Sequence, residues 1–191
     1  MIRKFFFALL TLLSTFKVHS SVKTKLSAED YIELLSLERH VEGGCFSLYY
    51  RANDSVMPLD SRYQSQERCA GSSIYFLLDK QDFSAWHRLK SDEIWHYYDG
   101  DSCIDMHVID ENGVLTRNVL GNPGMIKNAS FQVVIKAGCW FAAELQDKSS
   151  FALVGCTVSP GFEYEDFELG NRVTLSNQHP EHASIISRMT R

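Results

Sequence analysis

The 191-residue sequence contains no cluster of lysine or arginine, although it carries 19 basic side chains against 24 acidic ones. A chain with a formal net charge of −5 and no concentrated basic surface is a poor partner for nucleic acid or anionic lipid. Internal repeats and low-complexity tracts are also absent. With 45% hydrophobic residues, the sequence therefore predicts one globular domain with a sizeable core.

The sequence also lacks the common catalytic signatures. It has no G-x-S-x-G elbow, no H-E-x-x-H zinc motif and no glycine-rich phosphate loop. No two of its five cysteines lie within four residues of each other, which excludes a CxxC redox motif or zinc knuckle. These cysteines are Cys45, Cys69, Cys103, Cys139 and Cys156. Two interpretations of these cysteines remain: they form one or two disulfides, or they are buried free thiols.

The N-terminus is typical of a secretory signal peptide. Two basic residues precede the apolar run 5–16, and the small residues Val18 and Ser20 follow it. Twelve helical residues span about 18 Å, too little for a bilayer core of about 30 Å. We therefore predict a signal peptide over 1–20, export to the periplasm or the exterior, and no stable membrane anchor. The exported chain would have a net charge of −8, since its first twenty residues hold three basic and no acidic side chains.

The remaining chain begins with one helix and continues as strands. Ser27 and Asp30 form a capping box, so a helix should follow and end before Gly43. Short β-branched and aromatic runs then alternate with turns, a pattern that predicts an antiparallel sandwich or barrel. The expected strands lie near 45–51, 72–78, 84–89, 93–99, 103–109, 114–120, 131–135, 140–145 and 151–158.

Three further segments complete the predicted organisation. Residues 21–26 form a linker, 27–170 the domain, and 171–191 a C-terminal tail. The long polar loop 52–68 is interpreted either as a flap over a barrel mouth or as a mobile segment. The segment after Pro160, with its acidic run, is expected to be solvated.

The stretch 83–100 holds the candidate site. Strand alternation places His87 on one face with Phe83, Ala85 and Leu89, and Glu93 on one face with Trp95 and Tyr97. If the two runs pair as a hairpin, an imidazole and a carboxylate converge on a cavity lined by aromatic side chains.

The order of these runs resembles the cupins, which are small jelly-roll barrels. His87, Glu93 and Gly100 match the first cupin motif, whereas Leu89 and Phe141 stand where two further histidines are usual. The match is closer to a subfamily of these RmlC-like proteins called cupin 5, a domain of unknown function, and it covers roughly residues 28–169. The blocks that carry the resemblance are His40–Gly44, Tyr50–Arg51, Ser73–Tyr75, Phe83–His87, Lys90–His96 and Val154–Phe162. The resemblance implies a mainly β fold, a single cupin-type double-stranded β-helix with an N-terminal helix.

The same resemblance bears on a cofactor. Cupin metal sites use three imidazoles and a carboxylate on a divalent ion, and only His87 and Glu93 remain here as weak metal ligands. His96 lies three residues from Glu93, an odd offset that places it on the opposite face of a regular strand. No cofactor is certain, and a divalent metal ion stays open.

Without a metal, His87 and Glu93 form a pair that can handle protons, with Tyr97 or Tyr75 as an acid on the other side of a ligand. This arrangement resembles, by role alone, the sugar-nucleotide epimerase branch of the cupins. Trp95 and Tyr75 are candidate ligand-binding residues. Arg51 either clamps a carboxylate or phosphate at the mouth or forms a surface ion pair.

Together these observations predict an exported cupin-barrel protein, expected to be a homodimer through edge-strand pairing, that binds a small polar, sugar-like metabolite. As an enzyme it would be an isomerase or epimerase, with His87 as the general base and Glu93 and Tyr97 as further catalytic residues. The alternatives are a non-catalytic small-molecule binding module and a divalent-metal-dependent cupin enzyme.

Overall fold

The structure is a computed structural model that describes residues 25–191. The predicted signal peptide and most of the predicted linker lie outside the described residues, so export stays a prediction. Within the described part, no helix is long and apolar enough to cross a membrane.

Helix α1 (Ala28–Leu34) begins where the capping box predicts. The backbone N–H of Asp30 donates to Ser27 Oγ at 3.2 Å, and the carboxylate of Asp30 accepts from the N–H of Ser27 at 2.7 Å. Ala28 and the following Leu37 pack on Leu153 of the sheet below, so the helix covers part of one outer sheet face.

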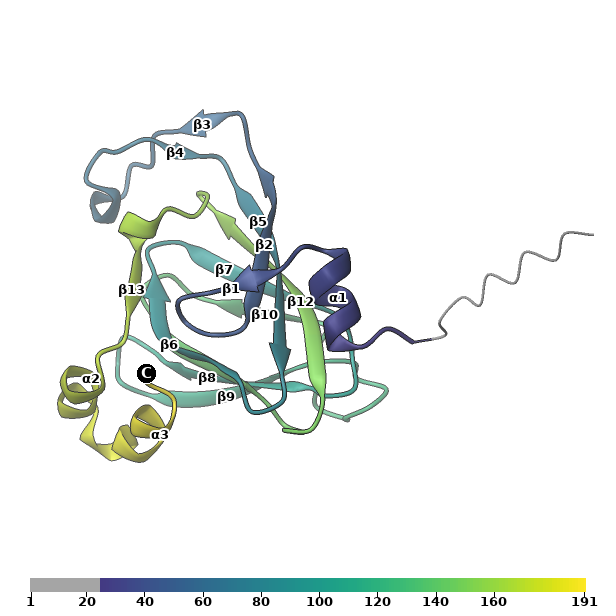
Figure 1. The fold of residues 1–191 in the computed structure, drawn as a ribbon. Coiled ribbons are helices and arrows are strands. Elements are labelled where there is room, and N and C mark those ends of the chain that lie inside the picture. The colour runs from purple at the N-terminus through teal and green to yellow at the C-terminus, as the bar shows by residue number, and fades with distance from the viewer. Residues whose placement is uncertain (1–24) are drawn as a thin grey trace, which may run out of the picture.

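Two antiparallel sheets form the barrel (Figure 1), which confirms the mainly β jelly-roll prediction. The first sheet contains, in spatial order, β1 (Glu38–Arg39), β2 (Cys45–Arg51), β5 (Ser72–Asp79), β12 (Phe151–Ser159), β7 (Asp92–Gly100) and β10 (Gln132–Ile135). The second contains β13 (Phe167–Leu169), β6 (Phe83–Leu89), β11 (Trp140–Leu145), β8 (Ile104–Ile109) and β9 (Leu115–Leu120). Each boundary of the nine predicted strands lies within one residue of the observed one.

The main core fills the space between the two sheets. Phe76, Trp95 and Phe141 meet edge to face at its centre, with ring centroids 5.2 and 6.2 Å apart. Fully burying a side chain of this kind stabilises the fold by roughly 1.5–3 kcal/mol. All five cysteines are free and four of them are buried, which selects the buried-thiol interpretation over disulfides.

The loop 52–68 contains short elements of regular secondary structure. It contains β3 (Ser55–Val56), the 3-10 turn Ser61–Tyr63 and β4 (Arg68–Cys69), and β3 and β4 pair as a small sheet beyond one end of the barrel (Figure 1).

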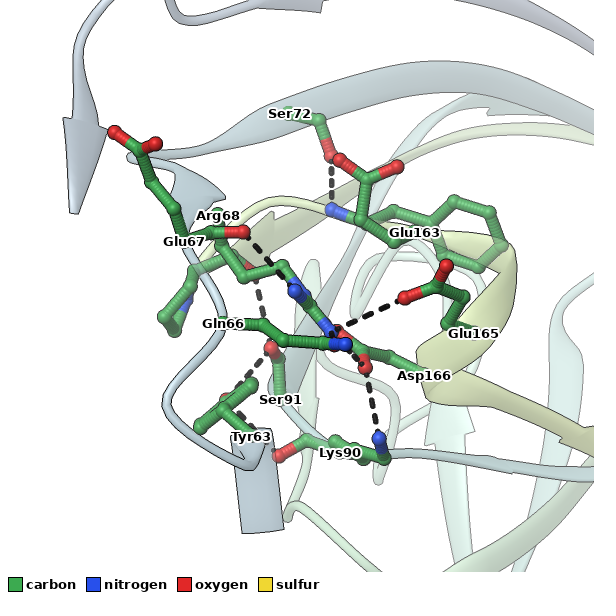
Figure 2. A network of polar contacts seen from close by, with 12 residues as sticks. Tyr63, Gln66, Glu67, Arg68, Ser72, Lys90, Ser91, Glu163, Glu165 and Asp166 are labelled. Atoms are coloured by element: carbon green, nitrogen blue, oxygen red, sulfur yellow. Dashed lines mark hydrogen bonds and ion pairs between the residues drawn. The ribbon is translucent and has the colours of Figure 1, made fainter. Parts of the chain in front are cut away.

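A buried ion pair ties this loop to the chain after Pro160. Arg68 donates from Nε and Nη2 to the two carboxylate oxygens of Asp166, at 2.6 and 2.8 Å, and Lys90 Nζ lies 3.1 Å from the same carboxylate (Figure 2). Tyr63 adds a hydrogen bond to the carbonyl oxygen of Lys90 at 3.0 Å. The expectation of a solvated segment holds for Tyr164, Glu165 and Glu168, which are exposed, and is wrong for Asp166, which is buried in this ion pair. The following strand β13 adds to the edge of β6.

The last residues form two short helices that cover the outer face of β6. They are α2 (Arg172–Gln178) and α3 (Ala183–Arg188), with the 3-10 turn Pro180–His182 between them. Leu175, Ile186 and Met189 enclose Trp86, which is fully buried. The backbone N–H of Trp86 also donates to the carbonyl oxygen of Met189 at 3.0 Å. The residues predicted only as a tail thus support the strand that carries His87.

Replacing Asp166 tests the role of the buried ion pair. Asp166→Ala leaves the Arg68 guanidinium buried without its partner, and we expect the free energy of unfolding to fall by about 3–5 kcal/mol. Glu168→Ala is the matched control, because its pair with Arg88 is largely exposed and should contribute less than about 1 kcal/mol. Urea denaturation of the two variants measures both values, and equal losses would contradict the assigned role.

Candidate functional site

The two runs that hold His87 and Glu93 do not pair as a hairpin, which corrects the sequence interpretation. β6 pairs with β11 and β13, whereas β7 pairs with β12 and β10 in the other sheet. The polar turn at Lys90 and Ser91 therefore crosses from one sheet to the other. His87 and Glu93 reach the barrel interior from opposite walls.

A cavity of about 380 Å³ opens between these walls at one end of the barrel. A volume of this size is typical of sites for small ligands. Its lining residues are Glu38, His40, Glu42, Phe46, Leu48, Arg51, Ser72, Ile74, Phe76, His87, Leu89, Glu93, Trp95, Cys156, Val158, Phe162, Glu163, Tyr164 and Phe167. Four of the predicted site residues are among them: His87, Glu93, Trp95 and Arg51.

A bulge in β6 determines which of its side chains face the cavity. His87 is opposite Phe141 and Ser84 is opposite Ala143, so β6 has one extra residue between these pairs. Regular alternation is broken, and Ser84 joins His87 on the inner side. Phe83 packs instead on the outer cluster around Trp86, so the predicted shared face of Phe83 and His87 is wrong.

A second bulge brings Arg51 to the cavity. On β2, Leu48 is opposite Ile74 and Tyr50 is opposite Ser73, which again leaves one extra residue. Arg51 thereby lines the same cavity as Leu48 despite the odd offset. Its guanidinium pairs with the carboxylate of Glu163 and donates to the carbonyl oxygen of Phe162 at 3.2 Å.

Glu42 is a site residue that sequence reasoning did not single out. It is buried at the cavity, where Oε2 lies 3.3 Å from His40 Nδ1 and 3.4 Å from His87 Nε2. Ser84 Oγ donates to Oε1 at 2.8 Å. The carboxylate is thus held between two imidazoles and a hydroxyl.

The backbone around Glu42 explains its position. Its carbonyl oxygen accepts from the N–H of Ala85 at 2.9 Å, which fixes the turn against β6. Gly43 follows with a φ of 110°, and a Cβ there would lie 2.1 Å from the carbonyl oxygen of Phe83. The pattern His-x-Glu-Gly-Gly was the available signal, because a glutamate just before a glycine turn can be directed into a barrel.

The protonation of His87 follows from its contacts. Its Nδ1 lies 2.7 Å from the carbonyl oxygen of Ala85, which can only accept, so Nδ1 carries a proton and Nε2 faces Glu42. Burial lowers the pKa of His87, and the carboxylate of Glu42 only partly opposes this shift. Burial works against ionisation of Glu42, but the imidazoles of His87 and His40 and the Ser84 hydroxyl together lower its pKa. At neutral pH the pair is therefore a neutral imidazole beside a carboxylate.

Glu93 behaves in the opposite way to Glu42. Burial raises the pKa of Glu93 to about 8, and the nearby negative charge of Glu42 adds to the shift. The neighbouring indole of Trp95 and thiol of Cys156 lower the pKa of Glu93, but they do not outweigh these two causes. At pH 7 this side chain is therefore a neutral carboxylic acid that can donate a proton.

Two buried polar atoms of the cavity wall lack a hydrogen-bond partner among the described residues. They are Oε2 of Glu93 and Nε1 of Trp95. Leaving one buried polar group without a hydrogen bond destabilises a fold by roughly 1–3 kcal/mol. Two such atoms side by side therefore indicate that a ligand or a water molecule binds there. The indole N–H needs an acceptor, and the Glu93 carboxyl can donate to one.

Tyr97 and Tyr75 do not line the cavity, which corrects their predicted contact with a ligand. Tyr97 is part of the main core, and its hydroxyl donates to the carbonyl oxygen of Gly100 at 2.7 Å. The ring of Tyr75 packs between Tyr49 and Tyr98, with centroids 5.0 and 6.0 Å away.

His96 is also outside the cavity, as its odd offset from Glu93 predicts. Its Nε2 lies 3.2 Å from the hydroxyl of Thr157 on the neighbouring strand. It is therefore unavailable as a ligand to a metal held by His87 and Glu93.

The donor set of the cavity does not fit a bound metal ion. Across residues 25–191, no three histidine, cysteine or acidic side chains are arranged to hold one. Leu89 lines the cavity and Phe141 packs on His87 with ring centroids 4.0 Å apart, at the positions where cupins usually have histidines.

Comparisons with known proteins agree with this architecture. The family Cupin_5, described as Cupin superfamily (DUF985), matches residues 29–170. A protein of known crystal structure from Shewanella oneidensis is 35% identical, covers 87% of this chain and 99% of its own, and has a TM-score of 0.76. A hypothetical protein from Leishmania major is 30% identical, with coverages of 86% and 99% and a TM-score of 0.78. No curated protein matches the chain.

The raised pKa of Glu93 predicts a pH-dependent stability. An unfolded glutamate ionises near pH 4.5, whereas the folded one keeps its proton to about pH 8, so folding loses stability as pH rises between these values. Glu93→Gln removes this loss, and we expect it to raise the free energy of unfolding by about 4 kcal/mol at pH 8 and by little at pH 4. Denaturant titrations at both values measure the difference.

The matched control is Glu33→Gln on the exposed side of α1, which makes the same substitution at a solvated glutamate and should change stability by less than about 0.5 kcal/mol at either pH. A Glu93→Gln effect that is the same at pH 4 and pH 8 would contradict a buried neutral acid.

Proposed function

Because the chain belongs to the Cupin_5 family of the cupin superfamily, we propose that its barrel cavity binds a small sugar-like metabolite and isomerises it by proton transfer. One observation carries the proposal: a neutral imidazole and a neutral carboxylic acid, His87 and Glu93, line one cavity from opposite walls. Two titratable groups whose environments hold them in these states form an acid–base pair at neutral pH.

His87 is the base of this pair. Its Nδ1 proton is committed to Ala85, so Nε2 takes the proton from a carbon next to a carbonyl group. The imidazolium that forms lies 3.4 Å from the Glu42 carboxylate, which stabilises the new positive charge. Ser84 keeps Glu42 in place through its hydrogen bond to Oε1.

Glu93 is the acid. As the C–H electrons move into the new carbon–carbon double bond, the carbonyl oxygen takes the proton of Glu93 and becomes the hydroxyl of an enediol. The resulting Glu93 carboxylate then removes the proton from the neighbouring hydroxyl, and His87 returns its proton to the adjacent carbon. The sum converts an aldose into a ketose and restores both side chains.

The placement of the tyrosines favours isomerisation over epimerisation. An epimerase must return the proton to the opposite face of the same carbon, which needs a second donor there. Tyr75 and Tyr97, the predicted candidates, do not line the cavity; Tyr164 does, but it is 59% exposed, and Glu93 on the opposite wall is assigned to the oxygen atoms of the sugar. A single base that serves two adjacent carbons on one face needs no such donor.

Export and a homodimer belong to the proposal as expectations from the N-terminus and from the cupin resemblance. Nucleotide sugars are mostly cytoplasmic, so an exported enzyme is better matched to a free sugar. This choice of substrate rests on the predicted signal peptide.

Proton exchange tests the reaction even when the product has not been identified. We expect the purified protein to exchange the C2 proton of an accepted aldose for deuterium in D2O, as seen by NMR. His87→Ala should slow exchange by at least about 100-fold while leaving the fold intact. If no aldose in a broad panel exchanges, and His87→Ala instead weakens binding, the cavity is a non-catalytic binding module.

The pH dependence of exchange provides a second test. The rate should rise as His87 loses its proton, with a pKa below its ordinary value, and fall as Glu93 ionises near pH 8. Glu93→Gln should lower the rate and remove the alkaline fall, whereas Glu33→Gln should retain the full bell-shaped profile. An alkaline limb that persists in Glu93→Gln would exclude Glu93 as the acid.

A further inference from the structure

The charged side chains that face the cavity are mainly acidic. Four glutamates line it: Glu38, Glu42, Glu93 and Glu163. Glu93 is neutral at pH 7, which leaves three carboxylates. Among the lining residues of the described chain, Arg51 is the only lysine or arginine.

Arg51 is already engaged. Its guanidinium pairs with Glu163 and donates to the carbonyl oxygen of Phe162, both on the segment at the cavity mouth. An anionic ligand would have to displace Glu163 and would still meet the carboxylates of Glu38 and Glu42. The predicted role of Arg51 as a clamp for a carboxylate or phosphate is therefore disfavoured.

The apolar walls of the cavity also suit a cation. Six aromatic side chains line it: Phe46, Phe76, Trp95, Phe162, Tyr164 and Phe167. The faces of aromatic rings attract ammonium groups, most strongly where water is excluded. The unpartnered Nε1 of Trp95 and Oε2 of Glu93 are neighbouring atoms, and together they are a sign of a ligand with oxygen atoms beside the cationic group.

We propose that the ligand of this cavity is an amine-bearing sugar, a class that rests on the proposed function of the same site. Its ammonium group is attracted by the carboxylates of Glu38 and Glu42 and by the aromatic walls. Its carbonyl and hydroxyl oxygens accept from Trp95 Nε1 and from the Glu93 carboxyl. The reacting carbons then lie between His87 and Glu93.

Three sugars that differ only at C6 test the charge preference: 6-amino-6-deoxyglucose, glucose and glucuronate. Isothermal titration calorimetry at pH 7 should show the amine binding at least about tenfold more tightly than glucose, with glucuronate the weakest. Glu38→Gln should reduce the preference for the amine over glucose. The control Glu33→Gln has the same net charge as Glu38→Gln but lies on α1, and it should leave the preference unchanged.

Glu163→Gln tests the same inference in the opposite direction. It frees the guanidinium of Arg51, so glucuronate affinity should rise severalfold while glucose affinity changes little. The proposal is overturned if glucuronate binds wild-type protein most tightly, or if the amine binds no better than glucose, including when neither binds.

Deuterium exchange separates this inference from the proposed function. Exchange at C2 of glucose without any preference for the amine would overturn the ligand class alone. A clear preference for the amine without exchange of any aldose would overturn the isomerase alone.

Discussion

The carboxylate of Glu42, buried between two imidazoles, is the interaction on which the electrostatics of the site depend. It remains ionised because His40, His87 and Ser84 surround it, and that fixed negative charge acts on both partners of the acid–base pair. It opposes the loss of charge on His87 and favours the neutral form of Glu93. Burial is the larger cause of both pKa shifts, and the charge of Glu42 weakens the shift of His87 while it strengthens that of Glu93.

The rest of the fold holds this charge in place. The turn that carries Glu42 is bonded to β6 through Ala85, and the outer side of β6 is covered by the helices that enclose Trp86. On the far side of the cavity mouth, the Arg68–Asp166 pair fixes the segment that contributes Phe162, Glu163 and Phe167 to the lining. The segment at the cavity mouth is therefore held by polar contacts, and the β6 wall of the cavity is supported by apolar packing.

The sequence predicted the strands well and the site only in part. Alternating hydrophobicity and turn residues locate each strand because they are local signals. His87, Glu93, Trp95 and Arg51 were identified and do share one cavity. Glu42 was missed because its role depends on long-range contact between a turn and β6. The helices after residue 170 were missed because short segments acquire their stability from packing on Trp86 rather than from their own propensity.

The bulges of β6 and β2 change which face of the strand the residues beyond them occupy. In a strand of period two, the side to which a residue points is set by whether its distance from a reference residue is even or odd, and each bulge reverses that rule once. Deleting one residue between Ser84 and His87 would restore regular alternation with both side chains still on the inner face, whereas pairing the present sequence without the bulge would turn the imidazole or the hydroxyl to the outside. Alignments of distant relatives should therefore be anchored separately on each side of both bulges, because a gap placed one residue away assigns the wrong face.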